Sequence, residues 1–372
     1  MSLNIVLQNN TSAQHLYAHV TGRDSNNNLF FLRADGVTGY SPPSPSGTLQ
    51  PVAQDCAIVL GGTGSQRTIT IPRISGGRVW FCKDQPLKFF INPGPSVVEP
   101  AATNPSDPNY LLDWGFCELT YNTSELYVNI SYVDFLSLAV SLKLENQSGN
   151  VRTVKGMPTG ARDKVCAKLI TQGQKDGKGW EKLVIKSKSG AFLRALSPNS
   201  GNVLIPGLFD GYFQPHVDAV WNKYTNETLT VNTQFKWGDA KGKVKNGKLT
   251  FDGVGSFGKP SASDIFSCNS GPFAHYQGVS DEVLNIGARL AAALNRSTLL
   301  KNSVQPEGEN VDNYYDEAIT NHYSRICHET ALESRGYAFP YDDVGSSKGQ
   351  DQSGFLNDPK PKVLTISVGK PL

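Results

Sequence analysis

The sequence predicts a mainly β protein in which a β-sandwich or barrel is joined to a mixed α/β region. Three observations predict this fold class. Short runs with β-type alternation, separated by Asn-, Gly- and Pro-rich turns, fill residues 1–149. Beyond Gly149, apolar residues also recur at helical spacing. A β-type run returns at residues 363–368 (VLTISV), and we expect this terminal strand to pair with the first region.

The composition indicates a chain with a substantial core. It has 372 residues, of which 38% are hydrophobic, enough for one large or two modest domains. We place a β domain at residues 1–155, completed by a C-terminal strand within 346–372. A mixed α/β domain occupies residues 156–345.

The charge pattern argues against two classes of partner. Lys and Arg total 35 and Asp and Glu total 33, giving a net charge of +2 without a basic block, so we expect no nucleic-acid partner. No run of eighteen apolar residues occurs, so we expect no membrane partner. We expect a monomer.

The elements can be assigned in chain order. The β-type runs of the first region are 3–7, 16–20, 29–32, 57–60, 68–71, 78–82, 87–91 and 136–144. A loop with five prolines spans residues 92–110, and loops of this length are often functional. In the mixed region we expect helices at 162–172, 214–224, 279–293 and 313–334, and strands at 183–188, 229–235 and 248–251.

Residues 116–135 (FCELTYNTSELYVNISYVDF) predict two strands joined by a turn at Asn122. Pairing around this turn puts Glu118 opposite Asn129 and leaves Asp134 about 17 Å further along, at ~3.4 Å per residue. Two carboxylates in an apolar hairpin suggest glycosidase chemistry. Acids on the solvent face of a strand are common, however, so the spacing alone does not establish a site. If the two acids act together, the second strand has to bend.

Other catalytic motifs are incomplete. Gly253-Val254-Gly255-Ser256-Phe257-Gly258 matches a dinucleotide motif, but Lys259-Pro260 follows where a helix should start. His328-Glu329 lacks a second histidine at position 332, so it forms no zinc-protease motif. We expect no metal and no organic cofactor.

Glycosylation acceptors and an even number of cysteines favour a secreted protein. The Asn-x-Ser/Thr acceptors are Asn9, Asn10, Asn122, Asn129, Asn146, Asn226 and Asn295. The cysteines are Cys56, Cys82, Cys117, Cys166, Cys268 and Cys327, and they allow 15 connectivities that the sequence cannot resolve. The beginning MSLNIVLQNN lacks the features of a signal peptide, so we expect a trimmed, extracellular chain with at least one disulfide.

Long motifs spread over most of the chain carry a family resemblance. They are FINPGP at 90–95, TNPSDPNY at 103–110, FCELTYN at 116–122, YVNISYVDF at 127–135, DGYFQPHVDAVWNKY at 210–224, DIFSCNSGPF at 264–273, ALNRSTLL at 293–300 and GYAFPYDDV at 336–344. In these motifs the chain resembles glycoside hydrolase family 64. Its members are endo-β-1,3-glucanases with a thaumatin-like fold, including the laminaripentaose-producing type.

The resemblance implies a wide groove between the two domains that binds β-1,3-glucan and its oligosaccharides, and an inverting mechanism. It assigns Glu118 as the general acid and Asp134 as the general base. The substrate-binding positions that it implies are Thr120, Asn122, Tyr127 and Ser131. A glycan on Asn122 would obstruct this groove, so we expect that residue to be unmodified.

The aromatic side chains that could stack on sugar rings are Trp80, Trp114, Tyr121, Tyr127 and Tyr132, although each of them also suits a hydrophobic core. A rival interpretation is a non-catalytic thaumatin-like protein that binds β-glucan, or an antifungal protein that acts on membranes. The presence of both acids disfavours it. Hydrolysis of another glucan linkage is excluded only by the resemblance.

Overall fold

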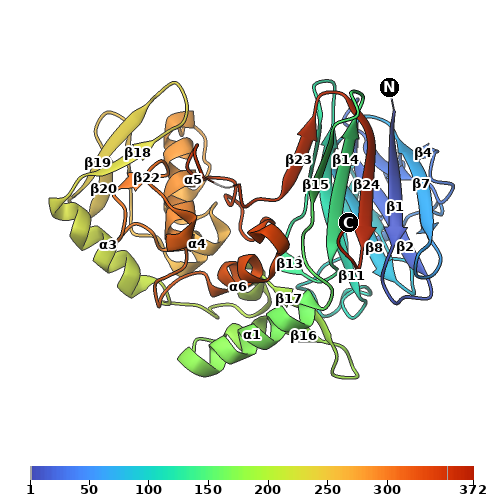
Figure 1. Ribbon diagram of the computed structural model, residues 1–372, viewed down its shortest axis with the longest axis horizontal. Coiled ribbons are helices and arrows are strands. Elements are labelled where there is room, and N and C mark those ends of the chain that lie inside the picture. Colours follow the sequence, from blue (N-terminus) through green and yellow to red (C-terminus); the bar gives the residue numbers. More distant parts are fainter. Residues whose placement is uncertain (1, 350) are drawn as a thin grey trace.

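The computed structural model of the chain describes residues 2–349 and 351–372. Two layers of β-sheet lie on one side of the molecule, and most of the helices lie on the other side with a smaller sheet (Figure 1). We call these two parts the β region and the mixed region. Within the described residues, no helix is both long enough and apolar enough to span a membrane.

The first layer of the β region is a five-stranded sheet in the order β15-β14-β24-β1-β7. Its strands are β1 (Leu3–Asn9), β7 (Gln66–Ile71), β14 (Val140–Asn146), β15 (Val151–Val154) and β24 (Pro361–Val368). The terminal strand β24 pairs in parallel with β1, for example Val6 with Thr365, and antiparallel with β14. The prediction that residues 363–368 return to the first region is therefore confirmed.

The second layer is a sheet in the order β23-β12-β11-β8-β2-β3-β4, with β6 paired to β2. Its strands are β2 (Leu16–Asp24), β3 (Leu29–Leu32), β4 (Gly39–Tyr40), β6 (Ile58–Val59), β8 (Ile74–Lys83), β11 (Trp114–Tyr121), β12 (Leu126–Asn129) and β23 (Phe355–Asp358). Leu119, Leu126 and Val128 of the central strands are buried, as the period of two in their sequences requires.

A short three-stranded sheet lies beside these layers, in the order β10-β9-β5. Its strands are β5 (Gln50–Pro51), β9 (Phe90–Asn92) and β10 (Ser96–Val98). The proline-rich segment 92–110 therefore begins with a hairpin, and Glu99 directly follows its second strand.

The mixed region contains two small sheets, in the orders β13-β17-β16 and β21-β20-β19-β18-β22. Their strands are β13 (Phe135–Leu136), β16 (Val184–Lys186), β17 (Phe192–Leu196), β18 (Leu229–Asn232), β19 (Asp239–Lys245), β20 (Lys248–Phe251), β21 (Gly255–Phe257) and β22 (Val304–Gln305). The helices are α1 (Ala161–Asp176), α2 (Pro198–Leu204), α3 (Gln214–Asn226), α4 (Ala262–Ser267), α5 (Asp281–Arg296) and α6 (His322–Thr330), with 3₁₀ turns η1 (Trp180–Leu183), η2 (Gly271–Phe273), η3 (Val311–Asn313) and η4 (Leu332–Ser334). The helices predicted at 162–172, 214–224 and 279–293 are confirmed.

The helix predicted at 313–334 is wrong over its first half. Tyr315 has a left-handed backbone (φ 62°), and its N–H donates to the carbonyl of Arg296. The helix begins only at His322, because the side chain of Asn321 accepts the N–H of Ser324 as an N-terminal cap. The predicted strand at 136–144 is likewise split into β13 and β14.

The predicted disulfide is also wrong. All six cysteines are free thiols and all are buried. Burial raises the pKa of Cys56 to about 11 and that of Cys82 to about 12, so these thiols stay protonated at neutral pH. Each cysteine acts as a small apolar core residue, which an even count in the sequence could not distinguish from a paired one.

Candidate active site

Glu118 is held on a regular part of the second sheet. It pairs with Asn129 of β12, as predicted, and with Arg78 of β8 on its other side. At the end of this ladder Gly77 approaches β11 closely, since a Cβ atom there would lie 3.0 Å from the carbonyl oxygen of Leu119. The strands therefore bring an arginine directly beside the candidate acid.

Asp134 comes from a segment that leaves the sheet. After β12 the chain turns toward the mixed region, where Ser131 bridges to Tyr337, and the carbonyl of Asp134 accepts the N–H of Ser197. Phe135 then packs edge-on against Trp114 and Phe116 of β11, with ring centroids 4.8 and 5.7 Å apart. This packing turns the chain back over β11, so the bend that the sequence required is present.

The bend brings the two carboxylates together across Arg78. The Nη2 atom of Arg78 lies 3.2 Å from Oε1 of Glu118 and 3.9 Å from Oδ2 of Asp134. The two carboxylate oxygens are therefore at most about 7 Å apart. Both side chains keep access to solvent, with 36% and 48% of their surface exposed.

A third carboxylate, Glu99, completes this group. Its Oε2 accepts a hydrogen bond of 2.7 Å from Nη1 of Arg78, whose guanidinium lies over Phe116 at 4.6 Å and near Trp80 at 5.4 Å. Burial raises the pKa of Glu99; Arg78 opposes this shift, and the charges of Asp134 and Glu118 add to it. We call Arg78, Glu99, Glu118 and Asp134 the Arg78 cluster.

A hollow of about 470 Å³ opens beside Arg78, Glu99 and Glu118. It is lined by Gly76, Gly77, Arg78, Glu99, Glu118, Leu119, Thr120, Tyr127 and Asn129. Thr120 and Tyr127 are paired across β11 and β12, so these two candidate binding residues lie together beside Glu118. The hydroxyl of Thr120 accepts the N–H of Gly76 at 3.2 Å.

The other two candidate binding residues lie apart from this lining. Asn122 is exposed at the turn, where its Oδ1 accepts the N–H groups of Ser124 and Glu125. Ser131 is 9% exposed, and its hydroxyl accepts the N–H of Val133 at 3.4 Å. The structure thus places Glu118, Thr120 and Tyr127 along one hollow and Asp134 across Arg78 from Glu118, while Asn122 and Ser131 lie toward the two ends of the hairpin.

Four of the five aromatic side chains suggested for sugar stacking are core residues. Trp80, Trp114, Tyr121 and Tyr132 are between 1% and 5% exposed, so they have the core role that the sequence also allowed. Tyr127 remains half-buried at the hollow; one ring face stacks on Phe355, and its hydroxyl lies 2.9 Å from that of Tyr337. Burial raises the pKa of Tyr127, which keeps this hydroxyl neutral.

Comparison with known proteins places this chain in a family. The family model described as beta-1,3-glucanase, glycoside hydrolase family 64, matches residues 1–368. The chain belongs to this family.

Curated relatives from two bacteria agree with the family. The glucan endo-1,3-beta-glucosidase of Cellulosimicrobium cellulans is 29% identical over 314 residues, and a protein of the same name from Arthrobacter sp. (strain YCWD3) is 30% identical over 312 residues. The matches cover 81% of this chain and 53% of each relative, so the chain spans about half the length of these curated relatives.

Solved structures of the family share the fold. A laminaripentaose-producing β-1,3-glucanase in complex with laminaritetraose has a TM-score of 0.85 and 30% identity, with 98% of both chains covered. A β-1,3-glucanase domain from Clostridium beijerinckii has a TM-score of 0.76 at 22% identity, covering 99% of this chain and 98% of that one, which shows the fold alone.

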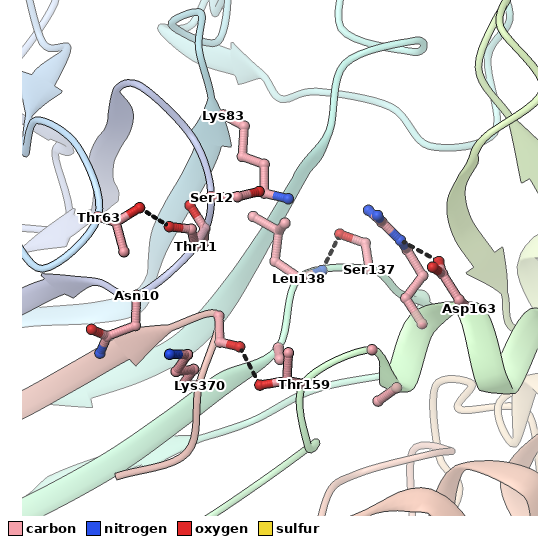
Figure 2. Close-up of a pocket in the computed structure, with 15 residues that line it drawn as sticks. Asn10, Thr11, Ser12, Thr63, Lys83, Ser137, Leu138, Thr159, Asp163 and Lys370 are labelled. Carbon is pink, nitrogen blue, oxygen red and sulfur yellow. Dashed lines mark hydrogen bonds and ion pairs between the residues drawn. The ribbon is translucent and has the colours of Figure 1, made fainter.

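A second hollow, of about 370 Å³, lies where the β region meets the start of α1 (Figure 2). Two of its cationic side chains, Lys83 and Arg162, pair with Asp113 at 3.1 and 2.7 Å. Among the described residues that line it, Asp163 is the one carboxylate, so this hollow lacks the pair of acids that a glycosidase uses. Within residues 2–349 and 351–372, no group of three His, Cys, Asp or Glu side chains is placed to hold a metal ion.

Sequence reasoning missed Arg78 and Glu99. Arg78 stands in a β-type run, where one cation gives no signal. Glu99 lies in the proline-rich segment 92–110, whose length pointed to function without indicating which residue carries it.

Proposed function

We propose that this chain is an endo-β-1,3-glucanase that hydrolyses β-1,3-glucan to short oligosaccharides with inversion at the anomeric carbon. One observation carries the proposal: two accessible carboxylates, from a regular strand and from a bent segment, meet across Arg78. Membership of the family and the names of its relatives support the choice of substrate.

In the proposed reaction Glu118 is the general acid. Its proton passes to the glycosidic oxygen as the bond from that oxygen to the anomeric carbon breaks. Asp134 takes a proton from a water molecule whose oxygen bonds to the anomeric carbon from the opposite face. Carboxyl groups about 6.5 to 9.5 Å apart leave room for such a water molecule, and a separation of at most about 7 Å between the nearest oxygens is compatible with that range.

The glucan would lie along the hairpin that carries the acid. Thr120 and Tyr127 line the hollow beside Glu118 and offer a hydroxyl group each. Asn122 uses its Oδ1 to fix the turn, which leaves its Nδ2 to donate to a sugar hydroxyl. We propose Thr120, Asn122, Tyr127 and Ser131 as the residues that bind substrate.

We extend the proposal to the whole chain as a secreted monomer of thaumatin-like architecture. Its β domain would comprise residues 1–155 with 346–372, its mixed domain residues 156–345, and the groove would run between them. The polymeric nature of the proposed substrate supports secretion. The glycosylation signals support it less, because Asn9, Asn129 and Asn295 are buried and cannot accept a glycan in the folded chain.

The test is the stereochemistry of cleavage. Laminarin is hydrolysed in an NMR tube, and proton spectra are recorded before mutarotation mixes the products. Inversion at a β-1,3 linkage releases the α-anomer first. If the β-anomer appears first, Asp134 is not the base of a single displacement. If no reducing sugar forms although the chain binds laminarin, the non-catalytic glucan-binding alternative is correct.

A further inference from the structure

The geometry points to Glu99 as a positioning residue for the hydrolysis: its hydrogen bond to Nη1 sets where the Arg78 guanidinium lies and thereby limits how strongly this cation pairs with Glu118. This inference rests on the proposed roles of Glu118 and Asp134. Glu99 itself touches neither the glycosidic oxygen nor the water in this proposal, because it acts through Arg78.

The guanidinium of Arg78 is shared unequally among three carboxylates. Its Nη1 donates to Glu99 at 2.7 Å, whereas Nε and Nη2 donate to Glu118 at 3.3 and 3.2 Å. Asp134 lies 3.9 Å from Nη2. The shortest of these contacts therefore goes to the carboxylate that has no part in the proposed proton transfers.

This asymmetry suits a proton donor. A guanidinium paired closely with Glu118 would stabilise its carboxylate and oppose proton retention. Glu99 holds the Nη1 side of the guanidinium close to its own carboxylate and adds a negative charge to the cluster. Both effects weaken the stabilisation that Arg78 offers to the Glu118 carboxylate, because a negative charge beside the pair offsets the positive charge of the guanidinium.

The surroundings of the cluster are consistent with this role. The charged groups that face Glu99 are Arg78 from β8, Glu118 from β11 and Asp134 from the bent segment. Burial and the two neighbouring acids raise the pKa of Glu99 despite Arg78, so three acids compete for one cation. The guanidinium packs over the rings of Phe116 and Trp80, and its rotation is fixed by Glu99 at Nη1 together with Glu118 at Nε and Nη2.

The experiment compares pH profiles of kcat/KM on laminarin for Glu99→Gln, Glu99→Asp and the parent protein. Without the charge of Glu99, Arg78 pairs more strongly with Glu118 and opposes its action as a proton donor. We expect the alkaline limb of the Glu99→Gln profile to move toward acid by on the order of half a pH unit to one unit. The acid limb should move less, because Glu99 carries less negative charge there.

Two variants separate charge from position. Glu99→Asp keeps the charge on a shorter side chain, so kcat should fall a few-fold while the alkaline limb stays in place. Glu145→Gln removes one negative charge from β14, where Glu145 pairs with Lys362, and should leave the profile unchanged. Thermal unfolding verifies that every variant is folded.

Each outcome has one meaning. A shifted alkaline limb in Glu99→Gln alone supports the inference, whereas a uniform loss at all pH values, or no change, overturns it. Wild-type turnover by Glu118→Gln would instead refute the proposed acid. A large loss in Glu118→Gln beside an unshifted Glu99→Gln profile removes only the role of Glu99.

Discussion

Two arginines in this chain lie over aromatic rings beside acidic partners, yet their surroundings differ. Arg78 lies over Phe116 and is 27% exposed. Arg296, at the end of α5, lies over Tyr314 at 4.5 Å and pairs with Asp342 at 3.1 Å; these side chains are only 2% and 0% exposed. We call Arg296, Asp342 and His328 the Arg296 cluster.

The difference lies in how completely the acids are neutralised. Asp342 accepts hydrogen bonds from Arg296, from the N–H of Ala338, and shares one of 2.8 Å with His328. Burial alone would raise the pKa of Asp342, but His328, Arg296 and the Ala338 N–H outweigh burial and lower it. In the Arg78 cluster burial prevails, and the pKa of Glu99 is raised.

The comparison separates two uses of the same residues. A buried acid whose partners are complete fixes one conformation and has no proton to exchange. In a partly exposed group with three acids for one cation, the pKa of Glu99 is raised, and perturbed pKa values of this kind are typical of functional sites. We therefore expect substitutions in the Arg78 cluster to change activity and those in the Arg296 cluster to change stability.

The largest effect is expected for the two proposed catalytic acids. Glu118→Gln and Asp134→Asn should each lower kcat by roughly 10²- to 10⁴-fold, since each removes one proton transfer. The unfolding midpoint should stay close to that of the parent, because both side chains are partly exposed. Reducing-sugar assays and thermal unfolding measure the two quantities. A large fall in the midpoint would show that these acids support the fold.

The opposite pattern is expected at Asp342. Asp342→Asn leaves Arg296 buried without its counter-ion, which should lower the free energy of unfolding by about 3 to 5 kcal/mol in urea titrations. The rate per folded molecule should stay near that of the parent. Asp252→Asn is the matched control: it removes a carboxylate that is 76% exposed and paired with Lys245, and it should cost less than about 1 kcal/mol. Equal losses in the two variants would contradict the comparison.

The stability gap between the parent and Asp342→Asn should also depend on pH. The pKa of Asp342 is lower in the folded chain than its ordinary value of 3.8. Its contribution is therefore complete above pH 3.8 and is lost as the pH falls through the lowered folded pKa. The difference between the urea midpoints of the parent and Asp342→Asn should be the same at about pH 5 and pH 7, and it should disappear below pH 3.8. A gap that persists unchanged in strong acid would mean that Asp342 is not ionised in the fold.

The sequence predicts the local parts of this site well. Alternation with a period of two determines which face of β11 carries Glu118 and pairs that residue with Asn129, because both depend only on neighbouring positions. The return of the terminal strand follows from the same pattern.

The parts that depend on distant packing could not be predicted. Asp134 reaches Arg78 because Phe135 packs on Trp114 and Phe116, and no local pattern encodes that contact. Glu99 arrives on a hairpin that pairs with β5, about forty residues earlier in the chain. The wrong first half of the helix predicted at 313–334 has a similar cause. The apolar pattern continues through Tyr315, whose backbone N–H is bonded to the carbonyl of Arg296.

The smallest effect is expected at the hydrogen bond between Tyr127 and Tyr337, which links the two clusters. The hydroxyls of Tyr127 and Tyr337 lie 2.9 Å apart, and Tyr337 precedes Ala338, whose N–H donates to Asp342. This bond joins the hollow to the segment held by the Arg296 cluster. Tyr127→Phe and Tyr337→Phe should each lower the free energy of unfolding by about 0.5 to 1.5 kcal/mol.

A double-mutant cycle isolates the bond. Because either single variant already breaks it, the double variant should be little worse, with a coupling energy of about 1 kcal/mol. Tyr337→Phe should also raise KM for laminarin a few-fold at constant kcat, since it frees the ring of Tyr127 beside Glu118 without touching the acids. Tyr276→Phe, at a tyrosine 63% exposed, should change neither quantity. If the two single losses add fully in the double variant, the hydroxyls do not interact, and the Arg296 cluster would have no hydrogen-bonded route through Tyr337 to the hollow.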